Sequence, residues 1–177
     1  MRKGGNLSYI VHQYWESPCG ILDLASIEEE LVMADWVDGW HRAATLSRFH
    51  RLTKLDFKEG TSDVIEKTKK ELEEYLAGKR KLFDLPLRLI GTPFQKRVWQ
   101  ELQKIPYGET ISYWQIARNI DCKAFQAVGG AVGANPFSII IPCHRVCGKD
   151  GGLTGYGGGL EAKKWLLAHE RKHGPGK

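Results

Sequence analysis

The chain has 177 residues, of which 42% are hydrophobic and 27% charged, a composition typical of a folded globular protein. No apolar run of about 18 residues occurs, which excludes a predicted transmembrane helix, and the basic N-terminus lacks the apolar stretch of a signal peptide. We therefore expect a cytoplasmic protein that is not bound to a membrane. Four cysteines do not suggest a disulfide framework in a chain of this length, so we expect reduced thiols at Cys19, Cys122, Cys143 and Cys147.

The net charge of +5 is unevenly distributed along the chain. Residues 1–90 carry 14 Lys and Arg against 15 Asp and Glu, whereas residues 91–177 carry 12 against 6. A basic half favours an anionic partner, nucleic acid first. Charge alone, however, favours a basic solvent-exposed surface without a nucleic-acid partner.

Residues 7–58 alternate loosely between apolar and polar side chains, which predicts a small antiparallel sheet. The strand candidates are residues 9–11, 14–15 and 20–24. Four large apolar residues that follow are predicted to lie in the core rather than to contact a ligand. They are Trp36, Trp40, Phe49 and Leu52.

Residues 61–77 predict a helix, with Asp63 as its cap and Glu66 completing a capping pair. Its apolar stripe consists of Ile65, Leu72, Tyr75 and Leu76. Gly78 is expected to end the helix. A linker is predicted at residues 79–87. We place the boundary near residue 90, between an N-terminal domain (residues 1–90) and a C-terminal domain (residues 91–177).

The C-terminal half begins with a clear helix start. Thr92 is a favourable N-cap, Pro93 a favourable first residue, and Gln95 completes a capping box. One apolar face is formed by Phe94, Val98, Leu102 and Ile105, and residues 106–108 break the helix.

Two shorter helices are predicted next, and together they form a helix-turn-helix candidate. Ser112 and Gln115 form a second capping box that opens a helix through Asn119, and another helical stretch covers residues 123–134. The second stretch is rich in small residues: Ala124, Ala127, Gly129, Gly130, Ala131, Gly133 and Ala134. Because each glycine costs a helix about 1 kcal/mol relative to alanine, something must approach this backbone closely. The approaching element is either another helix or, given the basic charge, DNA.

Cys143 and His144 stand next to each other after an apolar run. Three interpretations are open: a zinc ligand together with His144 and Cys147, a buried structural thiol, or a nucleophile activated by His144. A carboxylate would orient the imidazole, and Glu170 is one candidate among 21 acidic residues. A hydrolase of the cysteine-protease type would use the same elements.

Seven glycines crowd residues 148–159. Gly157-x-Gly159-x-x-Ala162 matches part of a dinucleotide fingerprint, but only 15 residues follow Ala162, too few for the rest of a βαβ unit. We interpret this segment as a loop that shapes a pocket.

The chain resembles the O6-alkylguanine-DNA alkyltransferases. The similarity rests on the run Pro142-Cys143-His144-Arg145-Val146 and on further segments in the order of that family's C-terminal domain. These segments are residues 92–95, 107–113, 127–131, 135–136, 155–156 and 165–170. Residues 74–78 and 83–87 resemble the family's N-terminal domain more weakly. The implied fold is α+β: a small ribonuclease-H-like α/β domain over residues 1–90, then a mostly helical domain with a helix-turn-helix over residues 91–177.

The resemblance also implies a function, direct reversal of DNA damage. The family flips O6-alkylguanine out of double-stranded DNA and transfers the alkyl group irreversibly to a cysteine, here Cys143. O4-alkylthymine is a second implied substrate. His144 would act as base through a water, and Glu170 would orient the His144 ring. Tyr113 would protonate guanine N3 or donate a hydrogen bond to it. Asn135 would brace the turn that carries the thiol. No cofactor or metal is implied, because the DNA donates the alkyl group.

Binding residues are implied in the same way. Pocket or substrate contacts would come from Val146, Tyr156, Gly157 and Lys163. The loss on removing Lys163 or Lys164 is expected to be modest if they are solvated charges on the last helix. A monomer would bind DNA through the minor groove. Its DNA contacts would be Gln126, Ala127, Gly129 and Gly130, with Lys123 and Arg118 on phosphates.

Two positions depart from the family pattern. Most members carry an arginine at the place of Gln126, where it fills the gap left by the flipped nucleotide. We therefore expect weaker DNA binding or slower flipping with intact chemistry. Gly157 replaces a common serine or alanine and is expected to leave more room for larger O6 groups. A non-catalytic sensor of alkylated DNA is the alternative function, and the presence of Cys143 argues against it.

Overall fold

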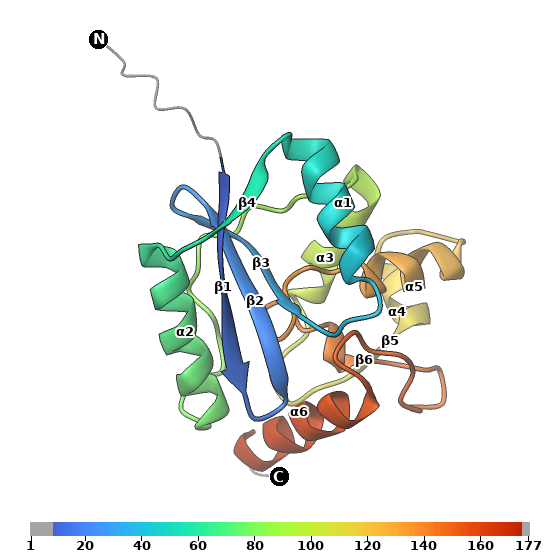
Figure 1. The fold of residues 1–177 in the computed structure, drawn as a ribbon. Helices are drawn as coiled ribbons and strands as arrows, with labels where there is room; N and C mark the ends of the chain where they lie inside the picture. The colour runs from blue at the N-terminus through green and yellow to red at the C-terminus, as the bar shows by residue number, and fades with distance from the viewer. Residues whose placement is uncertain (1–8, 175–177) are drawn as a thin grey trace.

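The computed structural model describes residues 9–174, in which a four-stranded sheet carries helices on both faces (Figure 1). The strands are β1 (Tyr9–Ser17), β2 (Gly20–Ile27), β3 (Glu30–Trp36) and β4 (Asp56–Glu59). Their order in the sheet is β3-β2-β1-β4. The candidates at residues 9–11 and 14–15 both belong to β1 and residues 20–24 belong to β2, and the predicted antiparallel pairing is confirmed for these two strands. Two further strands were not predicted: β3 pairs with β2 in antiparallel, and β4 pairs with β1 in parallel.

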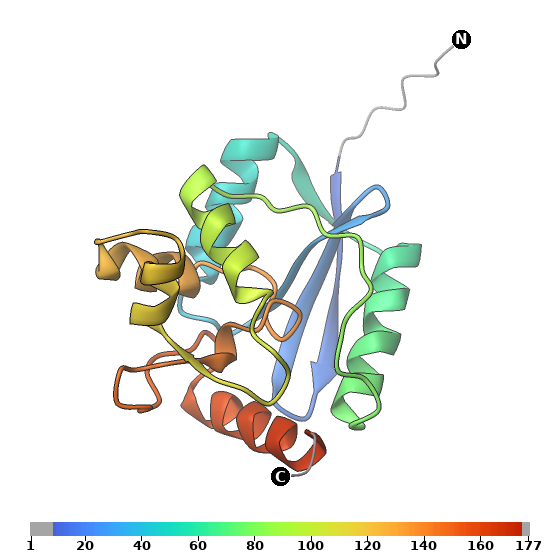
Figure 2. The same ribbon diagram turned by 180° about the vertical axis from the view of Figure 1, so that it is seen from behind.

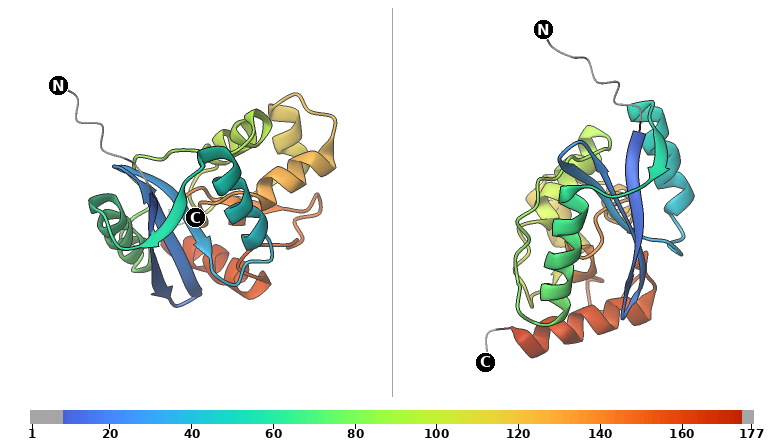
Figure 3. Two further views of the ribbon diagram at one scale, coloured as in Figure 1. Left: turned by 45° about the horizontal axis from the view of Figure 1, so that its top comes forward. Right: turned by 60° about the vertical axis from the view of Figure 1, so that its left-hand side comes forward.

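Helix α1 (Arg42–Thr53) lies within the region predicted to be sheet. Its buried side chains are Thr45, Arg48 and Phe49, and because two of these are polar, no apolar stripe marks the helix in the sequence. Figure 3 shows α1 and α2 on opposite faces of the sheet. Most residues of β2 and β3 are buried, whereas most of β1 is only partly buried.

Two of the four predicted core positions are wrong. Trp36 and Phe49 are buried as predicted, but Trp40 is 76% exposed and Leu52 is 50% exposed. Trp40 lies in the loop between β3 and α1, and Leu52 lies in the last turn of α1. Neither side chain therefore faces the sheet.

Helix α2 (Asp63–Leu76) matches the predicted helix, but its cap is one residue earlier than expected. Ser62 has extended backbone dihedrals, and its hydroxyl accepts a hydrogen bond from the Ile65 amide. Asp63 is instead the first helical residue, where its charge still favours the helix N-terminus. Gly78 follows the helix with a φ of +75°, a conformation that favours glycine.

The C-terminal half is mostly helical, as predicted. It contains α3 (Pro93–Leu102), β5 (Ile111–Ser112), α4 (Tyr113–Asn119), α5 (Phe125–Gly133), the 3₁₀ turn η1 (Cys143–Arg145), β6 (Val146–Cys147) and α6 (Leu160–His173). Helix α6 lies beneath one end of the sheet (Figures 1 and 3). None of the helices within residues 9–174 has the length and apolarity needed to cross a membrane.

The predicted helix starts are confirmed with one difference. Thr92 and Gln95 form both bonds of a capping box at α3. At α4, Ser112 accepts from the Gln115 amide, but the Gln115 side chain donates to Asn119 instead of returning to the cap. The second capping box is therefore half formed.

The free edge of β3 is covered by two segments from beyond residue 80. The extended chain between α2 and α3, visible in Figure 2, pairs with Leu31 through Pro86 and Arg88. Further along the strand, the Ala34 amide donates to the Pro136 carbonyl at 2.8 Å, and the Ser138 amide donates to the Ala34 carbonyl at 2.7 Å. The segment that leads to Cys143 is thus hydrogen-bonded to the sheet of the N-terminal half.

Candidate active site

The turn that carries Cys143 is held by the side chain of Asn135. The Asn135 amide group donates to the Ile141 carbonyl at 2.9 Å and accepts from the Phe137 amide at 3.0 Å, so it ties the two ends of the turn together. Between them, Ile139 has a φ of +70°, which is a strained conformation for a β-branched residue. The turn is therefore fixed by several hydrogen bonds rather than by local preference.

Cys143 is buried, and its thiol is weakly acidic in the free protein. Burial raises the pKa of Cys143 to about 11, and a hydrogen bond from Asn135 offsets only part of that effect. At neutral pH the group is a thiol. A nucleophilic role therefore requires a base that takes the proton when a substrate is present.

Glu170 is the acidic residue that lies next to His144. Glu170 Oε1 accepts from His144 Nε2 at 2.7 Å and from Tyr75 Oη at 2.7 Å. Both oxygens also accept from the Arg145 guanidinium, at 2.8 and 2.9 Å. Burial alone would raise the pKa of Glu170, but the hydrogen bonds from His144 and Arg145 outweigh burial and hold it well below its usual range. The carboxylate is therefore ionised and orients the imidazole.

The hydrogen bond to Glu170 also determines the tautomer of His144. Burial lowers the pKa of His144, so the ring is neutral, and an ionised carboxylate at Nε2 requires the ring proton on that nitrogen. Nδ1 is then an unprotonated acceptor, buried and without a protein partner among the described residues. This arrangement is suited to general-base catalysis.

A pocket of about 170 Å³ opens beside Cys143. Both halves of the chain contribute to its wall. The lining residues are Trp40, His41, Tyr113, Gly129, Val132, Gly133, Asn135, Ser138, Gly155, Tyr156 and Gly157. Burial raises the pKa of Tyr113, whose hydroxyl accepts from Thr154 at 3.1 Å and keeps its own proton to donate. The pocket therefore combines a thiol with a phenol donor.

Lys163 is not the solvated charge that the sequence suggested. Its side chain is fully buried, and Nζ donates to the Val146 carbonyl at 2.6 Å and to the Thr154 carbonyl at 3.1 Å. Burial lowers the pKa of Lys163. Neither Lys163 nor Val146 lines the pocket beside Cys143. Lys163 instead ties β6 to the glycine-rich loop, so the condition for a modest loss on its removal, a solvated charge, is not met.

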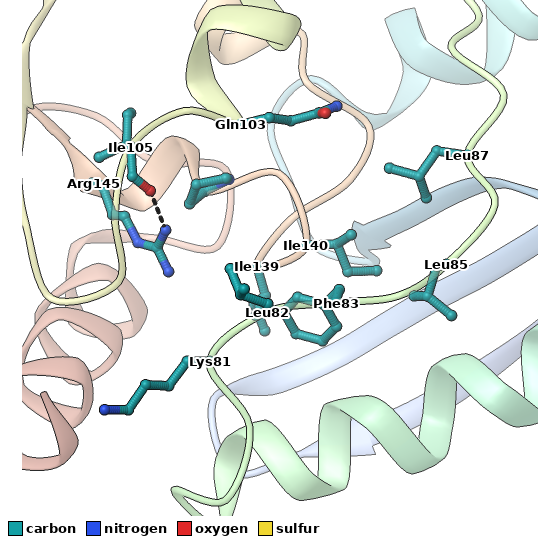
Figure 4. Close-up of a pocket in the computed structure, with 11 residues that line it drawn as sticks. Lys81, Leu82, Phe83, Leu85, Leu87, Gln103, Ile105, Ile139, Ile140 and Arg145 are labelled. Atoms are coloured by element: carbon teal, nitrogen blue, oxygen red, sulfur yellow. Dashed lines mark hydrogen bonds between the residues drawn. The ribbon is translucent and has the colours of Figure 1, made fainter.

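A second pocket, of about 200 Å³, lies against the same turn but is not lined by Cys143. Figure 4 shows the linker side chain Phe83 close to Ile139 and Ile140, with Lys81, Gln103 and Arg145 as the polar side chains around the pocket. The Arg145 guanidinium at its rim donates to the Ile105 carbonyl. Among residues 9–174, no cysteine, serine or threonine lines this pocket.

Two family models match the chain. The model described as 6-O-methylguanine DNA methyltransferase, DNA binding domain, matches residues 93–172, and the one described as its ribonuclease-like domain matches residues 10–89. The chain belongs to the 6-O-methylguanine DNA methyltransferase family. The predicted α+β fold, with a ribonuclease-like N-terminal and a DNA-binding C-terminal domain, is therefore confirmed.

Relatives in this family are similar over most of their length. The methylated-DNA–protein-cysteine methyltransferase of Mycolicibacterium paratuberculosis is 44% identical over 161 residues, which are 90% of this chain and 92% of the relative. That of Haemophilus influenzae is 41% identical over 93% of this chain and 88% of its own. Among solved structures, Mycobacterium tuberculosis OGT in complex with DNA has a TM-score of 0.78 and 39% identity, covering 93% of this chain and 95% of that one.

The small-residue face of α5 is open in this family member. A side chain at Gly129 or Gly130 would meet nothing within 4 Å, whereas one at Gly133 would touch Trp40 at 3.4 Å. Helix–helix packing therefore does not explain the first two glycines. Gln126 and Ala127 are exposed on the same helix.

The basic residues expected near this face are also exposed. Lys123 precedes α5, and the Arg118 guanidinium lies 4.7 Å from the ring centroid of the exposed Trp114. The cation–π contact holds Arg118 against the surface of α4. Within residues 9–174, no cluster of three or more His, Cys, Asp or Glu side chains could hold a metal ion.

Sequence reasoning missed the contribution of the N-terminal half to the pocket. His41 lines it, and Trp40 stands at its mouth, yet neither residue belongs to a family motif quoted above. One signal was present: Asp35 is a charged residue inside an apolar strand pattern, and such a residue needs a buried partner. That partner is His41.

Proposed function

We propose that this protein repairs alkylated DNA by transferring the alkyl group from guanine O6 to Cys143 Sγ, once per molecule. The observation that carries the proposal is the buried Cys143-His144-Glu170 arrangement at a pocket beside an open helix face. O4-alkylthymine, with the same alkyl–oxygen bond, is a second substrate. The protein acts as a cytoplasmic monomer, and the DNA supplies the alkyl group, so no cofactor takes part.

The chemical step begins with the thiol proton, which passes through a water to His144 Nδ1. Glu170, already ionised, stabilises the imidazolium that forms. The Cys143 thiolate attacks the alkyl carbon, the S–C bond forms, and the C–O bond breaks. The bonding electron pair moves into the guanine, where Tyr113 Oη donates its proton or a hydrogen bond to N3. The imidazolium returns its proton through the water to Tyr113 or to the leaving base, and the proton on the base moves to N1. The products are therefore neutral guanine, neutral His144 and an S-alkylcysteine.

Base extrusion precedes this step. We propose that α5 lies in the minor groove, with Gln126, Ala127, Gly129 and Gly130 against the duplex. Small residues support this placement because bulk would hold the helix away from the groove. Lys123 and Arg118 contact phosphates, which fits their exposed positions. The target base then enters the pocket beside Cys143.

The test is intact mass after incubation with a duplex that contains O6-methylguanine. We expect the protein to gain one methylene, and the gain to be absent in Cys143→Ala. Retained binding of the duplex without any gain in mass would refute alkyl transfer and favour a sensor of alkylated DNA.

A further inference from the structure

His41 enters the pocket beside Cys143 from the N-terminal half. It immediately precedes α1 and follows β3 by a short loop, so the sheet determines where its ring lies. The residue is only 7% exposed. It shares the pocket wall with Tyr113, Tyr156 and Gly157.

The ring is held in place by Asp35. His41 Nε2 lies 3.1 and 3.3 Å from the two carboxylate oxygens of Asp35. Asp35 is fully buried, and its other partners are the Ser138 hydroxyl at 3.2 Å and the Trp36 amide at 3.0 Å. If the ring swung away, a buried carboxylate would lose a hydrogen bond, which is costly. The imidazole is therefore a fixed part of the wall.

The ring occupies the space that a side chain at position 157 would need. A Cβ added to Gly157 would lie 2.3 Å from His41 Cε1 and 3.1 Å from Nδ1. The two groups exclude each other. The expectation that Gly157 leaves free room in the pocket is therefore wrong, because the imidazole fills that room.

We infer that His41 is a specificity-determining residue of the alkyl-transfer site, which limits the size of the O6 substituent. This inference rests on the proposed function. The N-terminal half supplies, through His41, the part of the wall that a side chain at position 157 would otherwise form. Methyl groups are accepted, and benzyl-sized groups are disfavoured.

The first experiment measures single-turnover transfer of methyl and benzyl groups from O6 of guanine in matched duplexes. In His41→Ala the ratio of benzyl to methyl rates rises on the order of tenfold, because a pocket wall is removed. His50→Ala is the control, since His50 lies on α1 with 67% of its side chain exposed. His41→Gln keeps a donor for Asp35 without the ring, and it shows the same direction if His41→Ala does not fold.

The second experiment adds a side chain at position 157 and then removes the His41 ring that it would meet. Gly157→Ser alone slows methyl transfer on the order of tenfold, because its Cβ meets the ring. Adding His41→Gly restores most of the rate. A purely structural role of His41 predicts the opposite, that the double variant is worse than either single one. An unchanged benzyl-to-methyl ratio in the His41 variants, or no rescue in the double variant, overturns the inference.

Labelling of Cys143 by iodoacetamide and by N-benzyl iodoacetamide separates this inference from the proposed function. The ratio of the two labelling rates reports pocket size without DNA. If the unchanged protein takes no methyl group from DNA, the proposed function fails. In that case the role of His41 in limiting pocket size is still tested: it is supported if His41→Ala or His41→Gln raises the relative labelling rate of the larger reagent, and contradicted if neither does.

Discussion

Tyr75 Oη donates a 2.7 Å hydrogen bond to Glu170 Oε1, although the two residues are 95 positions apart in the chain. Tyr75 belongs to α2 and Glu170 to α6, so a helix of the ribonuclease-like half helps to hold the carboxylate that orients His144. Both side chains are fully buried. The contact makes the N-terminal half part of the support of the active site.

Tyr75→Phe removes this hydrogen bond and little volume. We expect the free energy of unfolding to fall by about 1–2 kcal/mol, and alkyl transfer to slow several-fold because Glu170 holds His144 less firmly. Tyr107→Phe is the matched control, since the buried Tyr107 hydroxyl has no protein partner among the described residues. Urea denaturation and single-turnover transfer measure the two effects. Equal losses in the two variants would contradict the expected role of the Tyr75 hydroxyl.

Lys163→Met is expected to destabilise the protein by about 1–3 kcal/mol, since the Val146 and Thr154 carbonyls would lose their buried donor. Lys164→Met removes the same charge from an exposed position beside Glu161 and should cost less than about 0.5 kcal/mol. Thermal unfolding of both variants gives the comparison. A small effect in both would restore the view of Lys163 as a solvated charge.

The pH dependence of stability should reveal the buried Cys143 thiol. Burial raises its pKa from 9.0 to about 11, so at intermediate pH the unfolded chain releases the proton while the folded protein keeps it. The stabilisation from this group is therefore complete below about pH 9 and is lost as pH rises towards 11. Urea denaturation across this range should show a fall about 2–3 kcal/mol larger for the unchanged protein than for Cys143→Ala. Identical pH profiles would show that the thiol is not shielded.

Much of the C-terminal half could be predicted from its local signals. Thr92, Pro93 and Gln95 determine a helix start by their own hydrogen bonds and dihedral preferences, and the structure shows that start. Family motifs also brought Cys143, His144 and Glu170 together, which spacing alone could not do. The position of Asn135 in the turn follows from the same motifs.

The N-terminal contributions could not be predicted in this way. Helix α1 buries Thr45 and Arg48, so its inner face has no apolar period. Asp35 and His41 meet only because β3 and the following loop fold back beside the Cys143 turn. A polar pair that depends on the conformation of a loop leaves no periodic pattern in the sequence, and the exposure of Trp40 depends on the same loop.

Gln126→Arg tests the departure from the family arginine. We expect tighter binding to O6-methylguanine duplexes and faster transfer, because a guanidinium adds charge-assisted contacts in the gap left by the flipped base. Gln103→Arg adds the same charge at an exposed position that follows α3, outside the α4–α5 face. Fluorescence anisotropy at fixed salt and single-turnover rates provide the measurement. The idea fails if Gln126→Arg changes neither quantity more than the control does.

Gly130 variants separate stability from DNA binding. Its Cβ would meet nothing within 4 Å, so Gly130→Ala should raise the free energy of unfolding by about 1 kcal/mol. Gly130→Leu should also fold, yet bind duplex DNA much more weakly, because its side chain would stand between α5 and the groove. Denaturation and anisotropy are measured on the same samples. Full DNA affinity in Gly130→Leu would place the duplex elsewhere.

The covered edge of β3 limits how the N-terminal half could be separated from the C-terminal half or joined to another one. The domain boundary near residue 90 remains a prediction. Leu31 and Ala34 pair with backbone from beyond residue 80, so a fragment that ends near residue 90 would lose the Pro136 and Ser138 contacts and expose strand edge. An exposed edge strand has unpaired backbone N–H and C=O groups that can pair with strands of other chains. A chimera that joins this N-terminal half to a foreign C-terminal half must therefore preserve the register at Ala34.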